Sequence, residues 1–347
     1  PPLFAGAWMD IKQKGNRMNF TIQQIEQYAA SKRFREGLAI PSGKSMEFSM
    51  LGQGEYNINY LFTHPVNGQK LVLRINTGSQ MHLPDQIGYE YYALKLLEKS
   101  TRTPKPYYLD SENHLLVMEY LPGRALDYRT DLKLAAECLA QIHSVSVPEN
   151  CQLLCPDDPL DAMLDECQQM AEIYLRSDKG EKKTKEMLCR LLDAAKKHGK
   201  KEQQMSRCII NTELNSGNFL INGEGKNNYL IDWEKPLIGE AAQDLGHFLA
   251  PTTTYWKTDV LLTKEQKHDF VKQYQSCCKN TVEYEELQYR TDRYETMTCL
   301  RGVTWCAMAW VEYQDPNRPI QNQATYQKIQ DYLTENFLNW IWNSYFA

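Results

Sequence analysis

The sequence of 347 residues has no long apolar run, no framework of paired cysteines and no excess of basic residues. A membrane-spanning helix needs about 18 or more consecutive apolar residues. No stretch of the chain reaches that length, so we expect no membrane span. The formal net charge is −5, whereas proteins that bind nucleic acid usually carry a basic excess or a basic face. We therefore expect no membrane span and no nucleic acid as the partner.

The ten cysteines are scattered along the chain, and the only close pair, apart from the adjacent Cys277 and Cys278, is Cys151 with Cys155. A structural zinc site needs a second pair at ligand spacing, which the sequence lacks. Other cysteines, such as Cys138, lie inside apolar helical patterns, where a free thiol behaves as a small hydrophobe. We predict free thiols in a reducing, cytoplasmic location.

The first residues, PPLFAGAWMD, have neither the charged start nor the long apolar segment of a secretory signal peptide. We expect residues 1–20 to be a leader outside the fold, part of which precedes a native start at Met9 or Met18. The remaining chain is long enough for about two domains or lobes.

Residues 21–121 show the pattern of a small lobe built on a sheet. The periodicity predicts, in chain order, a helix at 21–36, a strand pair at 46–62 around a glycine-rich turn, a strand at 70–76, a helix at 87–100, and strands at 104–110 and 114–121. The turn before residue 70 contains Asn67-Gly68, a strong hairpin signal. We therefore predict a small N-terminal lobe of α+β class with a mostly antiparallel sheet.

Residues 122–347 are predicted to form a larger, mainly helical lobe. The expected helices lie at 132–145, twice within 160–200, and from 263 onward, including 297–312 and 326–346. The exception is 218–233, where two short apolar strands flank the turn sequence NGEGKNN and indicate a hairpin. The whole chain is then a bilobal α+β protein.

The residue types around this hairpin are those that phosphoryl transfer requires. Glu213 and Asn218 precede its first strand, and Asp232 ends its second strand. Phosphoryl transfer from a nucleotide uses one carboxylate to accept the hydroxyl proton, and an amide oxygen with a second carboxylate to hold Mg²⁺. Because a hairpin returns the chain on itself, we expect these three side chains to lie close together.

The segment 208–234 resembles the catalytic segment of the aminoglycoside phosphotransferase and choline kinase superfamily, which comprises small-molecule kinases with a protein-kinase-like fold. The family pattern is His-x-Asp-x-x-x-x-Asn, a strand hairpin, Ile-Asp-Trp-Glu and, further on, Asp-Leu. The corresponding positions here are Asn211, Glu213, Asn218, Ile231-Asp232-Trp233-Glu234 and Asp244-Leu245. The resemblance implies that Glu213 is the catalytic base, that Asn218 and Asp232 are metal ligands, and that Asp244 has a structural role.

The resemblance also implies how the N-terminal lobe holds a nucleotide. The turn with Gly52, Gly54 and Asn57 is similar to the short loop that covers the phosphates in this family. Arg74 lies where most members have a lysine, and Glu90 is its expected ion-pair partner.

The same resemblance implies where the adenine of the nucleotide docks and which cofactors are used. Residues 117–123 resemble the segment against which adenine docks, so that Met118, Glu119 and Leu121 would lie beside it. The implied cofactors are ATP, with GTP as the alternative nucleotide, and Mg²⁺. The resemblance covers residues 45–260 of the chain, in the family's order.

Two positions depart from the family pattern. Glu213 replaces an aspartate and places its carboxylate about one carbon–carbon bond, roughly 1.5 Å, further out. A misplacement of about 1 Å can reduce a rate roughly a hundredfold, so either the backbone compensates or little phosphate is transferred. Asn211 replaces a histidine that braces the loop, and an asparagine can make comparable hydrogen bonds.

The sequence gives weaker signals for the acceptor site than for the nucleotide site. Trp305 and Trp310 lie where choline-kinase relatives place aromatic side chains around a quaternary amine, and Trp over a cation is the favourable geometry for cation–π attraction. The alternative is that both belong to the core of an apolar helix. Trp256 and Glu234 are two further candidates for the acceptor site. The acidic net charge favours a cationic or neutral acceptor.

These inferences predict an ATP- and Mg²⁺-dependent phosphotransferase that acts on a hydroxyl of a small molecule of aminoglycoside, choline or related type. The alternative is a pseudokinase that binds nucleotide with little or no turnover, because Glu213 replaces the family's aspartate. Kinase activity on protein substrates ranks last, since the segment between Asp232 and Asp244 is too short for an activation-loop insertion.

Overall fold

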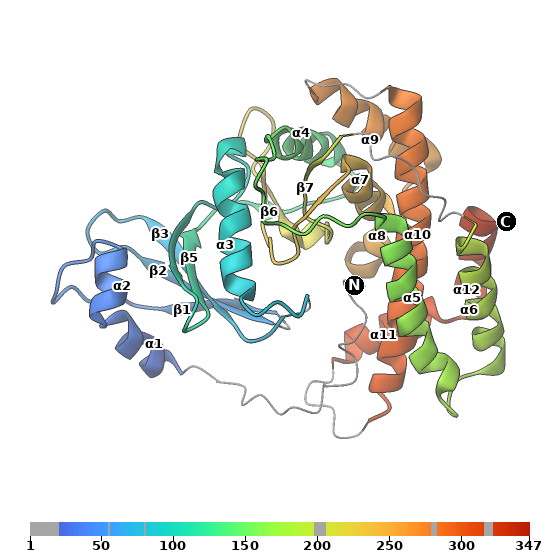
Figure 1. Ribbon diagram of the computed structural model, residues 1–347, viewed down its shortest axis with the longest axis horizontal. Helices are drawn as coiled ribbons and strands as arrows, with labels where there is room; N and C mark the ends of the chain where they lie inside the picture. The colour runs from blue at the N-terminus through green and yellow to red at the C-terminus, as the bar shows by residue number, and fades with distance from the viewer. Residues whose placement is uncertain (1–20, 55, 80, 198–205, 279–282, 316–321) are drawn as a thin grey trace.

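A computed structural model describes residues 21–54, 56–79, 81–197, 206–278, 283–315 and 322–347. The chain forms a small lobe with a five-stranded antiparallel sheet and a larger, mainly helical lobe, as predicted (Figure 1). The leader predicted at 1–20 lies outside the described residues. No described helix is both long and apolar enough to cross a membrane.

The sheet of the small lobe has the strand order β1-β2-β3-β5-β4. Its strands are β1 Ser49–Gln53, β2 Asn57–Thr63, β3 Lys70–Asn76, β4 Pro106–Asp110 and β5 Leu115–Glu119. The hairpin predicted at Asn67-Gly68 joins β2 to β3, and Gly68 adopts the left-handed φ of +73° that a tight turn requires.

The central strand β3 is buried on both faces of the sheet. Successive side chains of a strand point to opposite faces. Leu71, Leu73 and Ile75 pack with the cluster beneath α1 Ile22–Ala29 and α2 Lys32–Gly37, whereas Val72 packs with the cluster that contains α3 Gln86–Leu97. The same alternation directs Arg74 toward α3.

The helix predicted at 21–36 is in fact two helices, α1 and α2. The break occurs because the hydroxyl of Ser31 accepts a hydrogen bond from the amide of Phe34 and so starts a new helix. The predicted helix at 87–100 is α3 followed by a short 3₁₀ turn, Glu98–Ser100.

The larger lobe contains the helices α4 Leu132–His143, α5 Pro159–Arg176, α6 Lys182–Ala195, α7 Ala241–Leu249, α8 Pro251–Thr258, α9 Lys264–Cys277, α10 Tyr284–Glu312, α11 Gln323–Tyr332 and α12 Glu335–Ile341. A π-helical turn, Trp342–Phe346, follows α12. The helix predicted at 326–346 is therefore interrupted, because Thr334 caps a new helix by accepting from the amide of Phe337.

Helix α10 is longer than the predicted 297–312. Its first half is polar in sequence but buried, since ion pairs such as Arg290 with Glu240 (2.9 Å) and Glu295 with Lys267 (2.5 Å) satisfy its charges. Apolar periodicity does not reveal a helix face that is buried through ion pairs.

Two small sheets lie between the helices. Strand β7 Cys208–Ile210 pairs with β10 Leu237–Gly239, and β6 Arg124–Ala125 pairs with β8 Phe219–Ile221, which pairs in turn with β9 Tyr229–Leu230. The pair β8–β9 is the predicted hairpin. Both sheets hold the loops on which the candidate active site is built.

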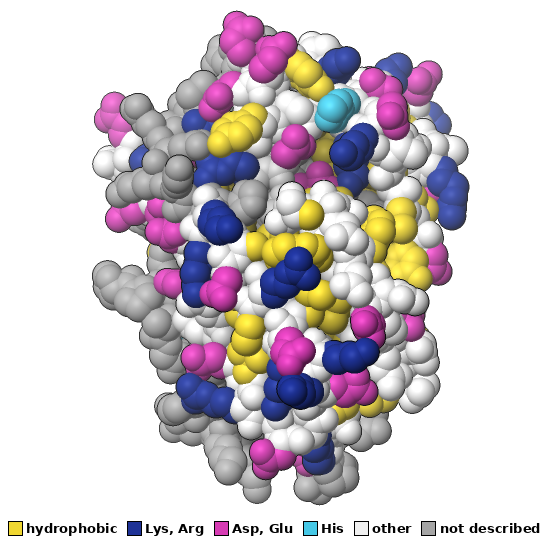
Figure 2. Space-filling model, turned by 90° about the vertical axis from the view of Figure 1, so that its right-hand side faces the viewer, with side chains coloured by type: hydrophobic (Ala, Val, Ile, Leu, Met, Phe, Trp, Pro, Cys, Tyr) yellow, Lys and Arg dark blue, Asp and Glu magenta, His cyan; other side chains and the backbone are white. Residues whose placement is uncertain are grey.

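The cysteines are all free, as predicted, and Cys138, Cys299 and Cys306 are buried. On the face of the helical lobe in Figure 2, the described basic side chains are interspersed with acidic ones and form no extended basic surface.

A glycine-to-alanine pair tests the packing of α7 against α10. A Cβ added at Gly246 would lie 2.6 Å from the backbone nitrogen of Glu295, whereas a Cβ at Gly52 would meet no described atom within 4 Å. We expect Gly246→Ala to lower the free energy of unfolding by about 1–3 kcal/mol through overpacking, and Gly52→Ala to leave it nearly unchanged. Urea unfolding measures both, and equal midpoints would contradict this packing.

Candidate active site

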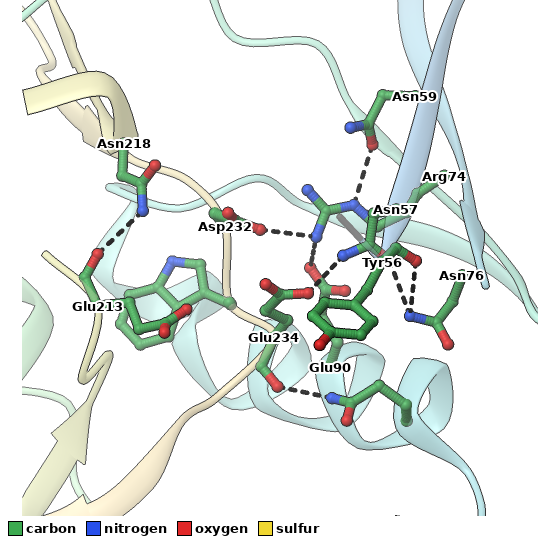
Figure 3. A network of polar contacts seen from close by, with 12 residues as sticks. Tyr56, Asn57, Asn59, Arg74, Asn76, Glu90, Glu213, Asn218, Asp232 and Glu234 are labelled. Carbon is green, nitrogen blue, oxygen red and sulfur yellow. Dashed lines mark hydrogen bonds and ion pairs between the residues drawn. The ribbon is translucent and has the colours of Figure 1, made fainter. Parts of the chain in front are cut away.

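The candidate site lies where β3 and α3 of the small lobe meet the loops after β7 and β9. Arg74 is at its centre, with a side chain that is almost fully buried. Its Nη1 atom lies 2.5 Å from Oε1 of Glu90 and 3.1 Å from Oδ1 of Asp232, and its Nε atom donates to Oδ1 of Asn59 at 3.0 Å (Figure 3). A single guanidinium therefore joins the sheet and α3 to a loop of the helical lobe.

The charges of this group depend on one another. Burial alone would lower the pKa of Arg74, but the carboxylates of Glu90 and Asp232 hold it above its usual range. Burial raises the pKa of Glu90, and Arg74 opposes that rise. Removing one partner of such a buried pair leaves the other charge uncompensated, which typically costs about 3–5 kcal/mol.

The loop after β7 is held by Asp244 near the start of α7. One of its carboxylate oxygens accepts from the backbone nitrogen of Asn211 and the other from that of Thr212, both at 2.8 Å. Thr212 has a φ of +69°, a conformation that non-glycine residues seldom adopt. His143 lies 3.2 Å from the same carboxylate and 2.9 Å from the hydroxyl of Tyr274.

Asn211 joins this loop to the loop after β9. Its Nδ2 atom donates to the backbone oxygen of Asp232 at 2.8 Å, and its Oδ1 atom accepts from the backbone nitrogen of Glu213 at 3.1 Å. Asp232 has a φ of +66°, so each of the two loops contains one residue in the left-handed region. The asparagine thus braces the positions of Asp232 and Glu213.

The structure brings Glu213, Asn218 and Asp232 to one place, as the hairpin predicts. The backbone nitrogen of Ile231 donates to the backbone oxygen of Asn218 at 2.8 Å, which sets Asp232 beside it. The Nδ2 atom of Asn218 donates to the backbone oxygen of Glu213 at 3.0 Å, so its Oδ1 atom remains as an acceptor (Figure 3).

Glu234 extends the acidic group toward the glycine-rich turn. Its carboxylate accepts from Nδ2 of Asn57, and Oδ1 of Asn57 accepts from Nδ2 of Asn76 at 2.9 Å (Figure 3). Burial and the nearby carboxylates, chiefly Asp232, raise the pKa of Glu234 to about 7. Asn57 therefore contacts the acidic loop from the small lobe.

The side-chain oxygens at this junction are ligands that suit a hard cation. Mg²⁺ prefers oxygen ligands, and Asp232, with 34% of its side chain exposed, and Asn218 both offer them. Three carboxylates, those of Glu90, Asp232 and Glu234, lie near the single guanidinium of Arg74. No three His, Cys, Asp or Glu side chains within the described ranges form a metal cluster, so a cation would need phosphate or water as further ligands.

The other residues predicted to bind nucleotide lie around the same sheet. The backbone nitrogen of Gly54 donates to the backbone oxygen of Asn57 at 2.8 Å, which closes the turn between β1 and β2. Met118 is buried and Glu119 half-buried at the end of β5, and Leu121 is buried just beyond.

Of the three candidate tryptophans, Trp256 contacts Trp305, and Trp256 and Trp310 both pack against the buried cluster that contains Tyr332. The rings of Trp256 and Trp305 meet edge to face at 5.4 Å, and Trp305 is exposed. Trp310 is half-buried and packs against Tyr174 of α5, also at 5.4 Å.

Two cations near Glu213 are absent from the prediction. The Nζ atom of Lys235 lies 2.6 Å from Oε1 of Glu213, and Arg301 forms two bonds to Glu166, at 2.8 and 3.1 Å. Burial alone would raise the pKa of Glu213, but Lys235 and Arg301 hold it below its usual range. Lys235 directly follows the Ile-Asp-Trp-Glu motif and could have been suspected from that position, whereas no local pattern marks Arg301.

The sequence matches the family model described as the phosphotransferase enzyme family over residues 47–287, more than half of the chain. No curated protein matches it by sequence. Among solved structures, the choline kinase of Cryptosporidium parvum Iowa II is 14% identical, with a TM-score of 0.61 over 93% of this chain and 100% of that one.

Two further solved structures have similar folds. The choline kinase LicA of Streptococcus pneumoniae is 18% identical, with a TM-score of 0.55 over 84% of this chain and 93% of that one. The ternary complex of streptomycin, ATP and APH(2")-IIa is 15% identical, with a TM-score of 0.56 over 88% and 98%. At these identities the likeness concerns the fold.

The hold of Asp244 on the loop after β7 can be measured through stability. Asp244→Ala leaves two backbone donors and His143 without their buried acceptor, so we expect a loss of about 2–4 kcal/mol of unfolding free energy. The control is Asp193→Ala, which removes an exposed carboxylate paired with Lys196 and should cost less than about 1 kcal/mol. Equal losses in urea unfolding would show that Asp244 does not hold the loop.

Proposed function

The chain belongs to the phosphotransferase enzyme family, and we propose that it transfers the terminal phosphoryl group of ATP to a hydroxyl of a small molecule. One observation carries the proposal. Three kinds of group meet at one junction between the lobes. They are the buried Arg74–Glu90 ion pair, the side-chain oxygens of Asn218 and Asp232, which suit a metal ion, and the carboxylate of Glu213. Phosphoryl transfer needs this combination of positioning and charge.

Arg74 is the group that we assign to the phosphates of the nucleotide. Its charge is permanent, and Glu90 and Asn59 fix its orientation. A Cβ at Gly52 would meet no described atom within 4 Å, so the fold itself does not require a glycine there. A glycine is expected where a phosphate approaches the backbone closely. Adenine would lie beside Met118, Glu119 and Leu121, and the ATP named in the APH(2")-IIa complex supports ATP as the nucleotide.

Asn218 and Asp232 are the residues that we assign to Mg²⁺. A bound Mg²⁺ supplies charge that offsets the phosphates and the developing negative charge. The two protein ligands are ordered beforehand, because Asn211 holds the backbone of Asp232 and the backbone of Glu213 holds the amide of Asn218.

Glu213 is the residue that we assign to the acceptor hydroxyl. Its lowered pKa keeps it a carboxylate, so it can accept a hydrogen bond from the hydroxyl and orient the attacking oxygen. The transition state for such transfer is loose, and positioning contributes more than early proton removal. The hydroxyl oxygen bonds to phosphorus as the bond to the leaving oxygen breaks, and the proton passes to Glu213.

The acceptor is proposed to be a small molecule of choline, aminoglycoside or related type that enters beside α8 and α10. A Cβ at Gly217, next to Asn218, would lie 3.7 Å from Nζ of Lys257, so α8 reaches the loop that carries Asn218. Trp305 lies one helical turn beyond Arg301 on α10, on the same side as Arg301. The edge-to-face pair of Trp256 and Trp305 would then meet a cationic part of the acceptor.

Transfer of radiolabelled phosphate from ATP to choline, ethanolamine and streptomycin tests the proposal. We expect the wild type to label at least one acceptor, and Glu213→Gln to reduce kcat by about 100-fold or more, in the range of general base catalysis. Glu224→Gln, which changes an exposed carboxylate on the β8–β9 turn, is the matched control. A Glu213→Gln variant as active as wild type would remove Glu213 from the mechanism. A wild type that binds ATP and labels nothing would favour the pseudokinase alternative.

The assignment of the tryptophans is tested with choline. A desolvated cation–π contact contributes about 1–2 kcal/mol. We therefore expect Trp305→Ala to have a KM for choline about tenfold higher than that of the wild type. Trp310→Ala removes a ring that packs on Tyr174, so it should lower stability and leave KM nearly unchanged. If the two variants raise KM equally, Trp305 has no special contact with the amine.

A further inference from the structure

The ion pair between Lys235 and Glu213 lies at the part of the site that we assign to the acceptor hydroxyl. The two side chains meet at 2.6 Å and are largely enclosed, with 14% of Lys235 and 28% of Glu213 exposed. Such a pair is more strongly coupled than one on the surface. Arg301 also raises the positive potential here, but its own hydrogen bonds go to Glu166.

The backbone that carries Lys235 is held at three consecutive carbonyl groups. The backbone oxygen of Glu234 accepts from Gln86 at 2.6 Å, that of Lys235 from Thr212 at 2.8 Å, and that of Pro236 from Tyr89 at 2.7 Å. The donors come from α3 of the small lobe and from the loop after β7. The side chain of Lys235 therefore extends from a backbone segment whose position is fixed.

The backbone of Glu213 is equally fixed, whereas its carboxylate is held through a contact of its own, with Lys235. Its backbone nitrogen donates to Asn211 at 3.1 Å, and its backbone oxygen accepts from Asn218 at 3.0 Å. The three rotatable bonds of a glutamate leave its carboxylate free to move unless a partner holds it. Within the described ranges, Lys235 at Oε1 is the hydrogen-bond partner of this carboxylate, and no partner is seen for Oε2.

We propose that Lys235 is a positioning residue, which binds Oε1 of Glu213 and so presents Oε2 to the hydroxyl of the acceptor. This inference rests on the proposed phosphotransferase function. During transfer the acceptor oxygen forms its bond to phosphorus, the bond to the leaving diphosphate oxygen breaks, and the hydroxyl proton goes to Oε2. Lys235 keeps its own protons throughout and gains or loses no bond to the substrate.

Kinetics of the pair test this role. Phosphate transfer from ATP with Mg²⁺ to choline, ethanolamine and streptomycin is measured for wild type, Lys235→Met, Lys235→Arg, Glu213→Gln and the double variant Lys235→Met with Glu213→Gln. We expect Lys235→Met to lower kcat about 10- to 100-fold, as a carboxylate displaced by about 1 Å would. The KM for ATP should change less than about twofold, because the proposal assigns Lys235 to Glu213 and the phosphates to Arg74. Lys235→Arg should recover part of kcat.

The double variant separates positioning from general stability. If Lys235 acts through Glu213, then Lys235→Met adds less than about a twofold loss in the background of Glu213→Gln, because residues that act as a unit are not additive. Lys133→Met, which breaks the exposed pair with Glu224, is the control for loss of a lysine. Urea midpoints of the same variants, without nucleotide, should also be non-additive if the pair exists in solution.

Each outcome decides the proposal. An active wild type with a non-additive loss of kcat supports it. An active wild type with unchanged kcat in Lys235→Met, or with fully additive losses, overturns the positioning role and leaves the phosphotransferase function intact. A wild type that labels none of the three acceptors overturns the proposed function and the role of Lys235 in it, even if the urea midpoints still show the ion pair.

Discussion

The buried guanidinium of Arg74 is the contact on which the junction between the lobes depends. It comes from the central strand β3, meets Glu90 of α3 at 2.5 Å, and reaches Asp232 of the helical lobe at 3.1 Å. A cation can be buried at this depth only if carboxylates offset the cost of its desolvation. Those two carboxylates and that of Glu234 place three acidic groups around one guanidinium, a surplus of negative groups. In the function that we propose, a divalent cation would neutralise this surplus, so the contact that joins the lobes would also prepare the site for Mg²⁺ and phosphate.

Different residues hold the backbone of the site's loops and the side chain of Glu213. Asp244 and Asn211 hold the backbone of both loops, including the left-handed residues Thr212 and Asp232, through buried hydrogen bonds. Strain of this kind persists only when the surroundings impose it. The longer side chain of Glu213 is then held separately by Lys235. A glutamate can in this way occupy a position where its family resemblance implies an aspartate.

Local patterns in the sequence predict much of this fold. The bilobal α+β class, the strand β3 and the turn at Asn67-Gly68 follow from alternation and turn chemistry over a few residues. The breaks at Ser31 and Thr334 do not, because apolar periodicity continues through both caps. The full length of α10 does not either, because ion pairs bury its polar half. In the site, the hairpin predicts that Asn218 and Asp232 meet, but the contact of Lys235 with Glu213 depends on where two loops dock.

Binding of ATP with and without Mg²⁺, measured by titration calorimetry on the wild type, tests the central claim most directly. With Glu90, Asp232 and Glu234 around a single arginine, the junction should repel a nucleotide whose phosphates carry no metal. We predict at least about tenfold tighter binding with Mg²⁺, equivalent to about 1.4 kcal/mol, and loss of this gain in Asp232→Asn. Equal affinity after the metal is chelated, or no binding in either condition, would contradict the account.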